Sequence, residues 1–443
     1  MEGGTEGMML YCPDITPRVR WIVDFCGDQL FDSPISITSD KQEFERTEGP
    51  RINYSAEQIP GIFAIRPAGL LSETAIRHQS ITCFEYNGRK AFFPVEGDFP
   101  FDIFSASFYL LSRYEEYLPH EKDIFGRFAH TQSLAWREGF LDIPLVNYWL
   151  RDLRDALGRK YPEMIFRYTI FKFVPTYDID SAWSFLNKGW RRNLGGALKS
   201  VVKGEWRLLR ERVGVLQGRF RDPFDAYEWL DSLHLYCRLR PYYFFLVAAR
   251  CSGVDRNTPP SSGALQELIH YHSSGYRVGI HPSWRSGDEK RVLREEIEWL
   301  EVIAGKPITR SRQHYIRFTL PHTYRHLLTY GIRQEFSMGY GSINGFRASV
   351  ASSFYWYDLP KEEVTALRIF PFCFMDANSY YEQKQTAAGT MTELMHYYRH
   401  IRKVNGLMVT IWHNSFLGTD PEFAGWRQVY EVFLKEEVFW YGN

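Results

Sequence analysis

The sequence lacks an excess of charge of either sign, and it contains few cysteines. Lys and Arg together number 53, and so do Asp and Glu, which gives a formal net charge of zero. Without a global positive field, we expect no nucleic-acid partner. The six cysteines are scattered without CxxC spacing. We interpret them as reduced, buried thiols of a cytosolic protein rather than as a disulfide framework.

Long hydrophobic runs are also missing. The sequence has no stretch of 18 or more apolar residues that could form a transmembrane helix. Its first seven residues contain neither the basic region nor the apolar region of a signal peptide. We therefore expect a cytoplasmic protein.

Hydrophobic and aromatic residues, by contrast, are abundant. Hydrophobic residues make up 44% of the 443 residues, which is ample for a large core, and the length favours two domains. Aromatic residues make up 17%. Such enrichment suits surfaces that contact carbohydrate, although aromatic-rich cores are its more common cause.

The first part of the chain, residues 1–165, reads as a small α/β accessory domain. Segments 58–66 and 90–94 look like strands interrupted by Pro and Gly. Segments 101–118 and 144–158 carry apolar residues at helical spacing. No residue pattern in this part indicates an activity.

The second part, residues 166–443, alternates strands with helices. Apolar runs predict strands at 171–176, 241–248, 276–280 and 406–412. Helical spacing predicts helices at 224–240, 264–274, 290–304 and 321–330. This alternation predicts a parallel sheet, closed or nearly closed into a (β/α) barrel.

A basic insertion at 188–221 separates the first of these strands from the first helix. It carries ten Lys and Arg residues against two Glu, together with Trp190, Trp206 and several Leu and Val residues. A basic amphipathic segment can lie on an anionic membrane surface or bind an acidic glycan. The alternative, which we favour at this point, is a solvated helix that packs its apolar stripe on the barrel.

Five polar islands lie on apolar runs of the second part. They are Val174–Asp180, Val278–Ser283, Ser311–Tyr315, Gly345–Ala348 and Val409–Asn414. Ligands of α/β folds bind at the carboxyl ends of the strands, where these islands are expected to lie. Two Asp, two or three His and an Arg at that end are the parts of a metal-assisted hydrolase.

The aspartates and histidines of these islands have alternative interpretations. Asp178 and Asp180 would leave an extended strand on the same side, one as a general base and one as a metal ligand, or they would cap a turn. His281 could bind a metal or form a hydrogen bond at the rim. His314 could be a further ligand, or part of an exposed edge strand. His413 ends an apolar strand, as a general acid or base would.

The two arginines of the islands are candidates to hold a carboxylate. Arg312 could orient one of the aspartates. Arg347 could keep an aspartate charged, or it could form a surface salt bridge.

The order of these motifs resembles the polysaccharide deacetylases of the NodB-like carbohydrate esterase group. Thr176-Tyr-Asp-Ile-Asp180 resembles the family's Thr-Phe-Asp-Asp motif, and Pro241–Val247 resembles its apolar second strand. Gly275–His281 is similar to the stretch that presents the first metal-binding His. Ser311–Tyr315 stands where the family has Arg-x-Pro-Tyr, and Leu407–His413 resembles its closing motif. The resemblance implies a distorted (β/α) barrel of the NodB-homology type.

The first part resembles the accessory domain of some bacterial members of this group. The resemblance rests on Leu111–Tyr117 and Asp123–Phe128. It implies no known activity.

The second part departs from the family pattern at three positions. Ile179 separates the two aspartates, Arg285 stands where a second metal-binding His is usual, and His314 replaces a Pro. A third metal ligand is therefore missing unless His314 supplies it. We expect Asp180, His281 and His314 to hold a divalent metal, with Zn²⁺ as the expected ion.

The resemblance implies the removal of N-acetyl groups from an amino-sugar glycan. Asp178 would be the general base, Arg312 or Arg347 would keep it ionised, and His413 would protonate the departing amine. Backbone N–H groups near Tyr315 would help to hold the oxyanion. The candidates to contact sugar are Tyr315, Trp284, Tyr242 and Trp356.

Two other functions compete with this one. Arg285 is compatible with a decayed site in a glycan-binding or scaffold protein. The third possibility is a metal-independent hydrolase of a non-peptide C–N bond. The basic insertion 188–221 would place any of them at the inner face of the membrane if it binds lipid.

Overall fold

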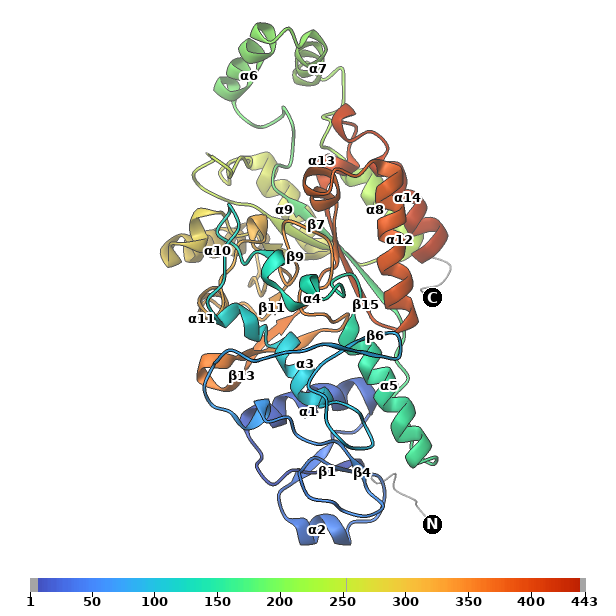
Figure 1. Ribbon diagram of the computed structural model, residues 1–443. Coiled ribbons are helices and arrows are strands. Elements are labelled where there is room, and N and C mark those ends of the chain that lie inside the picture. The colour runs from blue at the N-terminus through green and yellow to red at the C-terminus, as the bar shows by residue number, and fades with distance from the viewer. Residues whose placement is uncertain (1–6, 252, 439–443) are drawn as a thin grey trace.

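The computed structural model describes residues 7–251 and 253–438. The first part of the chain, at the bottom of Figure 1, contains a four-stranded parallel sheet with the order β2-β1-β3-β4. Its strands and a separate two-stranded hairpin are β1 (Met9–Tyr11), β2 (Ser36–Thr38), β3 (Arg51–Asn53), β4 (Phe63–Ala64), β5 (Phe84–Tyr86) and β6 (Arg89–Ala91). Its helices are α1 (Pro17–Leu30), α2 (Lys41–Arg46), α3 (Ile103–Leu111), α4 (Leu134–Arg137) and α5 (Leu145–Lys160).

Local sequence fixes where several of these helices begin. Thr16 accepts a hydrogen bond from the backbone N–H of Val19, and Pro17 occupies the first turn of α1, where its missing N–H costs nothing. Asp102 caps α3 in the same way through the N–H of Ser105. The helices predicted at 101–118 and 144–158 correspond to α3, followed by a 3₁₀ turn, and to α5.

The second part is a mixed α/β structure built on a nine-stranded sheet. The strand order is β12-β13-β11-β10-β9-β8-β7-β15-β14, and the pairs are parallel except for the antiparallel β12–β13 pair. The strands are β7 (Lys172–Ile179), β8 (Tyr242–Phe245), β9 (Arg277–Ile280), β10 (Arg310–Ser311), β11 (Gln334–Glu335), β12 (Phe354–Asp358), β13 (Glu363–Ile369), β14 (Phe374–Met375) and β15 (Leu407–His413).

Helices surround this sheet and agree closely with the predicted segments. The helix predicted at 290–304 is α10 (Lys290–Ala304), and the other three predicted helices are α8, α9 and α11. Helices α6 and α7 lie within the basic insertion. The bounds are α6 (Trp190–Val202), α7 (Trp206–Leu216), α8 (Tyr227–Cys237), α9 (Gly263–Gly275), α11 (His322–Thr329), α12 (Ala387–Lys403), α13 (Asn414–Leu417) and α14 (Trp426–Val432).

The described strands do not close into a complete ring, so the sequence-based expectation of a distorted barrel, closed or nearly closed, stays a prediction. The strand order begins at β12 and ends at β14, and no described strand joins these two edges. Trp21 of α1 donates its indole N–H to the carbonyl of Tyr355 and packs against the rings of Phe354 and Tyr357. The β12 edge of the sheet therefore packs against the first part of the chain.

The two parts share one buried interior. A single hydrophobic cluster contains side chains of both, among them Trp21, Phe108, Phe354 and Tyr357. Arg18 of α1 is buried and forms an ion pair with Glu362, at 2.5 Å. The division into domains 1–165 and 166–443, and an accessory role for the first, stay predictions. None of the helices in the described chain has the length and apolar character needed to cross a membrane.

Candidate functional site

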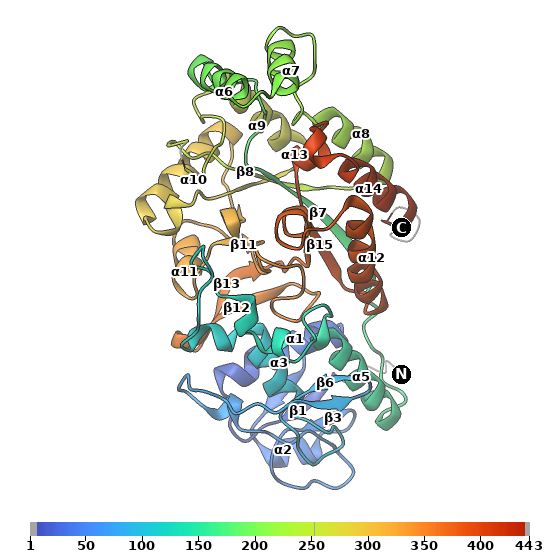
Figure 2. The ribbon, with the colours of Figure 1, turned by 45° about the horizontal axis from the view of Figure 1, so that its top comes forward.

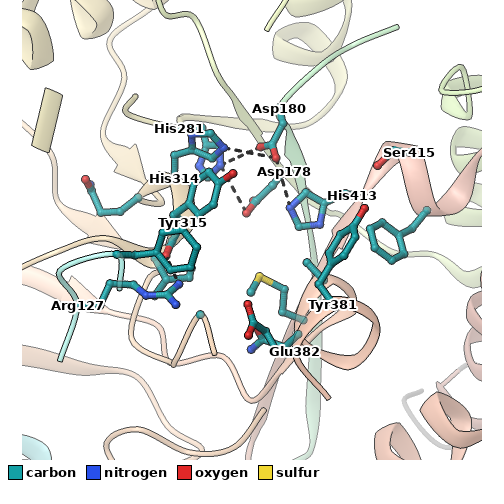
Figure 3. A pocket seen from close by; sticks show the side chains of 18 residues that line it. Arg127, Asp178, Asp180, His281, His314, Tyr315, Tyr381, Glu382, His413 and Ser415 are labelled. Carbon is teal, nitrogen blue, oxygen red and sulfur yellow. Dashed lines mark hydrogen bonds and ion pairs between the residues drawn. The ribbon is translucent and has the colours of Figure 1, made fainter. Parts of the chain in front are cut away.

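A cavity of about 410 Å³ opens at the carboxyl ends of β7, β9, β10, β14 and β15 (Figure 3). The polar side chains that the sequence placed at strand ends gather here, as expected of parallel strands. The lining residues are Phe125, Arg127, Asp178, Asp180, His281, Gln313, His314, Tyr315, Ile316, Gly341, Met375, Ala377, Asn378, Tyr381, Glu382, His413, Ser415 and Phe416.

The two aspartates have different surroundings. Asp178 lies on β7 beside His413 of β15 and is 2% exposed. Arg312, which is fully buried, donates from Nη1 to Asp178 Oδ1 over 3.1 Å and from Nε to the carbonyl of Phe336. Asp180 follows the strand and its side chain is 39% exposed. Asp178 is thus held as a buried ion pair, whereas Asp180 reaches into the cavity (Figure 3).

Asp180, His281 and His314 form a group whose ligand atoms lie within 4.8 Å of one another. Asp180 Oδ1 is 3.1 Å from His281 Nε2, and Asp180 Oδ2 is 3.6 Å from His314 Nε2. The other ring nitrogen of each histidine already has a hydrogen-bond partner. His281 Nδ1 lies 2.6 Å from the carbonyl oxygen of Arg312, and His314 Nδ1 lies 2.9 Å from Asp255 Oδ1. Acceptors behind the rings are the usual way to aim histidine ligands at a metal.

The donor set of this group fits a divalent metal ion. A carbonyl only accepts hydrogen bonds, so His281 Nδ1 carries a proton and Nε2 points at Asp180, where its lone pair can bind a metal in the neutral form of the ring. Two electron-pair donors then face each other, and Asp180 Oδ1 is buried with no hydrogen-bond partner among residues 7–251 and 253–438. A cation between them would satisfy both. Two imidazoles and one carboxylate are ligands that Zn²⁺ takes in proteins.

The charges of this cluster shift the pKa values of Asp180 and His314. Burial would raise the pKa of Asp180, but His314 and His281 outweigh burial and hold that pKa well below its usual range. Burial would lower the pKa of His314, but the carboxylates of Asp180 and Asp255 raise it to about 9. The Asp180 carboxylate is therefore held beside a positive charge, which either a protonated His314 or a bound cation can supply.

His413 ends β15 on the opposite side of the cavity. Its Nδ1 lies 2.6 Å from Asp376 Oδ1, and its backbone N–H donates to Asp376 Oδ2. Burial opposes protonation, but Asp376 and the two strand-end aspartates raise the pKa of His413 to about 10. His413 Nε2 faces Asp180 Oδ2 at 3.7 Å. This ring can carry a proton into the cavity at neutral pH.

A loop of the first part reaches the cavity and supports the segment that carries His314. Arg127 donates from Nη1 to the carbonyl of Tyr315 over 2.7 Å and from Nε to Asp123 over 2.6 Å. Tyr315 has a φ of 58°, a left-handed conformation that is costly for a residue with a side chain. The guanidinium lies where any side chain at Gly341 would stand. Arg127 therefore holds a strained loop at the cavity wall.

Most lining residues of this site were not predicted from the sequence, and neither were Asp255 and Asp376, which support its histidines. Asp376 left a signal, because it follows an apolar run that includes β14, much as Asp178 follows the apolar first part of β7. Asp255 lies in a loop without such a pattern, and Phe125 and Arg127 belong to a part of the chain in which no site residue was expected.

The structure does not bring Arg347 to Asp178. Its guanidinium is fully buried and binds both carboxylate oxygens of Glu116, at 2.8 and 2.6 Å, and the carbonyl of Gly339. Arg312 alone of the two arginines holds Asp178. Arg347 instead joins the two parts of the chain.

Three of the four predicted sugar-contacting residues do not line this cavity. Tyr242 lies at the start of β8, the end of the strand remote from the site, and accepts a hydrogen bond from Arg277. Trp356 is buried against Tyr324. Tyr315 lines the cavity, and Trp284 packs behind it at a ring distance of 5.6 Å.

Comparisons with known proteins give a family without an assigned function and several distant structures. Residues 8–162 match a family described as a family of unknown function, DUF7033. No curated protein matches the chain.

The chain is similar to several solved structures at low identity. A polysaccharide deacetylase from Mycobacterium smegmatis is 13% identical, with a TM-score of 0.39 over 61% of this chain and 85% of that one. The PuuE allantoinase is 10% identical, with a TM-score of 0.38 over 62% and 87%. The polysaccharide deacetylase Bc1974 from Bacillus cereus is 10% identical, with a TM-score of 0.30 over 61% and 88%.

Proposed function

We propose that this protein is a metal-dependent hydrolase that removes N-acetyl groups from an amino-sugar glycan. One observation carries the proposal: Asp178, Asp180, His281, His314 and His413, which lie far apart in the sequence, line one cavity. Each of the three imidazoles has its Nδ1 beside a protein oxygen and its Nε2 within 4 Å of an aspartate of β7 or its end.

Asp180, His281 and His314 would hold the metal, which we expect to be Zn²⁺. A divalent ion bound there lowers the pKa of a water molecule and polarises the acetyl carbonyl. These three side chains give the number of protein ligands that is typical of a catalytic zinc site, and none is required from Arg285, which lies on a 3₁₀ turn and pairs with Glu289. This completeness supports an enzyme over a decayed glycan-binding protein.

Asp178 is the proposed general base. The buried pair with Arg312 fixes the orientation of its carboxylate. Oδ1 is occupied by Arg312, and Oδ2 lies 3.9 Å from His281 Nε2, at the edge of the cavity. Asp178 can thus accept one proton from the attacking water as the new C–O bond forms.

His413 is the proposed general acid. Its raised pKa supplies a proton at neutral pH, and Asp376 keeps the ring oriented with Nε2 toward the cavity. Transfer of that proton to the sugar nitrogen allows the C–N bond to break and releases acetate and an amine. Base and acid then stand on different strands around the bound acetamide group.

The walls of the cavity suit a sugar ring. Tyr315, Tyr381 and Phe416 present aromatic surface, and the hydroxyl of Ser415 and the carboxylate of Glu382 add polar groups. Aromatic faces with a few convergent polar groups are typical of small-molecule sites. A cytoplasmic location stays a prediction.

Acetate release from N-acetylglucosamine oligomers tests the proposal. The zinc-loaded protein is expected to release acetate, and His413→Ala is expected to lower kcat by about 10²- to 10⁴-fold. His326→Ala, in α11, is the matched control and should retain full activity. No release by the metal-loaded protein from any N-acetylated saccharide would contradict the proposal, and release unaffected by a chelator would favour a metal-independent hydrolase.

A further inference from the structure

The basic insertion folds into a helical hairpin that stands away from the rest of the molecule. Helices α6 and α7 pack against each other and project beyond the body of the protein in both views (Figures 1 and 2). We call residues 189–219 the basic hairpin. It follows β7, so it rises from the same end of the sheet as the candidate site.

The hairpin is built to hold its shape. Arg212 of α7 lies over Gly196 of α6, where a side chain would collide with the guanidinium, and donates to Asn193 Oδ1 over 3.1 Å. The same guanidinium lies 4.6 Å from the ring centre of Phe185. These contacts fix α7 to α6 and to the segment that leaves β7.

The hairpin is also anchored to the body of the protein. Arg192 donates to the carbonyls of Cys251 and Asn257, each over 3.0 Å. The same loop carries Asp255, which orients His314. Asp222 accepts hydrogen bonds from the backbone N–H groups of residues 184–186 at the base of the hairpin. The hairpin therefore presents a preformed surface.

Apolar side chains of the hairpin face solvent rather than the sheet. Trp190 is 70% exposed, Leu198 is 59% exposed and Trp206 is 64% exposed. This overturns the sequence-based preference for a helix that buries its stripe on the body. On α6 the exposed side chains recur at helical spacing and form one stripe, made of Trp190, Leu194, Leu198, Val201 and Val202.

Basic side chains surround these apolar residues. Eight Lys and Arg residues stand against two Glu in the hairpin, although the whole chain has no net charge. Lys199, Lys203, Arg207 and Arg210 are exposed, and within the described chain their side chains make no ion pair or hydrogen bond. The basic hairpin thus carries a local excess of positive charge, and these four side chains can contact a partner.

We propose that the basic hairpin docks on an anionic lipid surface. Exposed Trp and Leu side chains can enter the boundary between headgroups and acyl chains, while Lys and Arg contact the anionic headgroups. A purely acidic protein partner would not require the solvent-facing Trp and Leu side chains. The docked hairpin brings the carboxyl end of the sheet toward the membrane surface, whatever reaction occurs there.

Vesicle co-sedimentation of the full chain tests this proposal. We expect binding to phosphatidylcholine vesicles that contain phosphatidylglycerol and much weaker binding to phosphatidylcholine alone. The triple variant Lys203→Gln, Arg207→Gln, Arg210→Gln should bind the anionic vesicles about 100-fold more weakly, since each basic residue near such a surface contributes about fivefold. Added salt should weaken binding by the wild type.

A second variant tests the apolar contribution. Trp190→Ser with Leu198→Ser should also lose binding, and brominated acyl chains should quench the fluorescence of Trp190 and Trp206 in the wild type. The matched control, Arg46→Gln, Arg159→Gln, Lys160→Gln, removes three exposed charges from α2 and α5 and should bind like the wild type. Unchanged far-UV circular dichroism and thermal midpoints would show that the variants are folded.

Three results would overturn the proposal. The first is no binding to anionic vesicles, and the second is equal binding by the triple variant and the wild type. The third is a lipid-free protein that sediments as a dimer, binds no vesicles, and becomes monomeric in the hairpin variants. The last result would assign the hairpin to contact with a second copy of the chain.

Discussion

At the scale of single residues, an oxygen atom behind each imidazole holds that ring in its orientation. The backbone carbonyl of Arg312 lies at Nδ1 of His281. The carboxylates of Asp255 and Asp376 lie at Nδ1 of His314 and of His413, respectively. His314, which Asp255 supports, is a proposed metal ligand, and His413, which Asp376 supports, is the proposed general acid. The two carboxylates raise the basicity of both rings. The two histidines differ in their proposed roles because they lie on different sides of Asp180.

The support of His314 by Asp255 can be tested by removing one charge. Asp255→Asn should weaken zinc binding by about 10- to 100-fold, because the amide orients His314 less well and lowers its basicity. Competition with a chromophoric chelator measures this affinity. Asp288→Asn, which alters an exposed carboxylate paired with Arg317, should leave it unchanged. Equal zinc affinity in both variants and the wild type would remove Asp255 from the account.

The sequence could predict the site residues that lie at the ends of strands. Asp178, His281 and His413 end apolar runs, and register alone brings them to one edge of a parallel sheet. Arg347 and Asp255 lie in loops whose paths depend on contacts made by the whole chain. The sequence therefore predicted a wrong partner for Arg347 and gave no indication of Asp255.

At the scale of elements, strand and helix positions in the second part were largely predictable, and loops were not. The predicted helix at 290–304 coincides with α10 because its apolar positions keep helical spacing. Helix α12 carries the same spacing at Leu394, Tyr397, Tyr398 and Ile401 and was missed. The two-residue strands β10 and β11 are too short to show a period of two.

The loop that carries Arg127 is the element with the most direct consequence for activity. Arg127→Ala should lower kcat/KM by up to about 100-fold, because the Tyr315 carbonyl loses the donor that holds the strained His314–Ile316 turn in place. We expect the loss mainly in kcat, since Arg127 positions the wall behind the reacting group. Arg127→Lys should recover part of it. Steady-state kinetics on an N-acetylated oligosaccharide measures both.

A purely structural role for Arg127 would give a different pattern. Loss of activity in proportion to loss of folded protein, with kcat per folded molecule unchanged, would contradict a positioning role. Arg137→Ala, an exposed change at the end of α4, is the control and should leave both kcat and KM unchanged.

At the scale of the whole molecule, buried ion pairs connect the first part of the chain to the second. Glu116 lies between Arg113 of the first part and Arg347 of the second, and all three side chains are buried. Removal of one partner from such a cluster leaves an uncompensated buried charge. The two parts are therefore coupled electrostatically as well as by their shared core, and the β12 edge of the large sheet packs against α1.

Glu116 also makes stability depend on pH. Burial would raise its pKa, but Arg347 and Arg113 outweigh burial and lower it to about 2. A lowered carboxyl pKa stabilises the fold above the unfolded value near 4.3, and that stabilisation is lost as the pH falls from about 4.3 toward 2. Its size is on the order of 3 kcal/mol.

The variant Glu116→Gln should remove this contribution. We expect a lower free energy of unfolding at pH 7, by about 3 to 5 kcal/mol, and a flatter decline toward acid than in the wild type. Denaturant unfolding at a series of pH values measures both. Glu48→Gln, an exposed change, should follow the wild-type curve. Wild-type stability in Glu116→Gln at pH 7 would show that the cluster does not join the two parts.

The metal site is the central claim, and anomalous diffraction from a zinc-soaked crystal tests it most directly. The account predicts a peak at the zinc edge about 2.0–2.2 Å from His281 Nε2, His314 Nε2 and a carboxylate oxygen of Asp180. The peak should disappear in His314→Ala crystals. A zinc peak elsewhere, with none among these three side chains, would contradict the account.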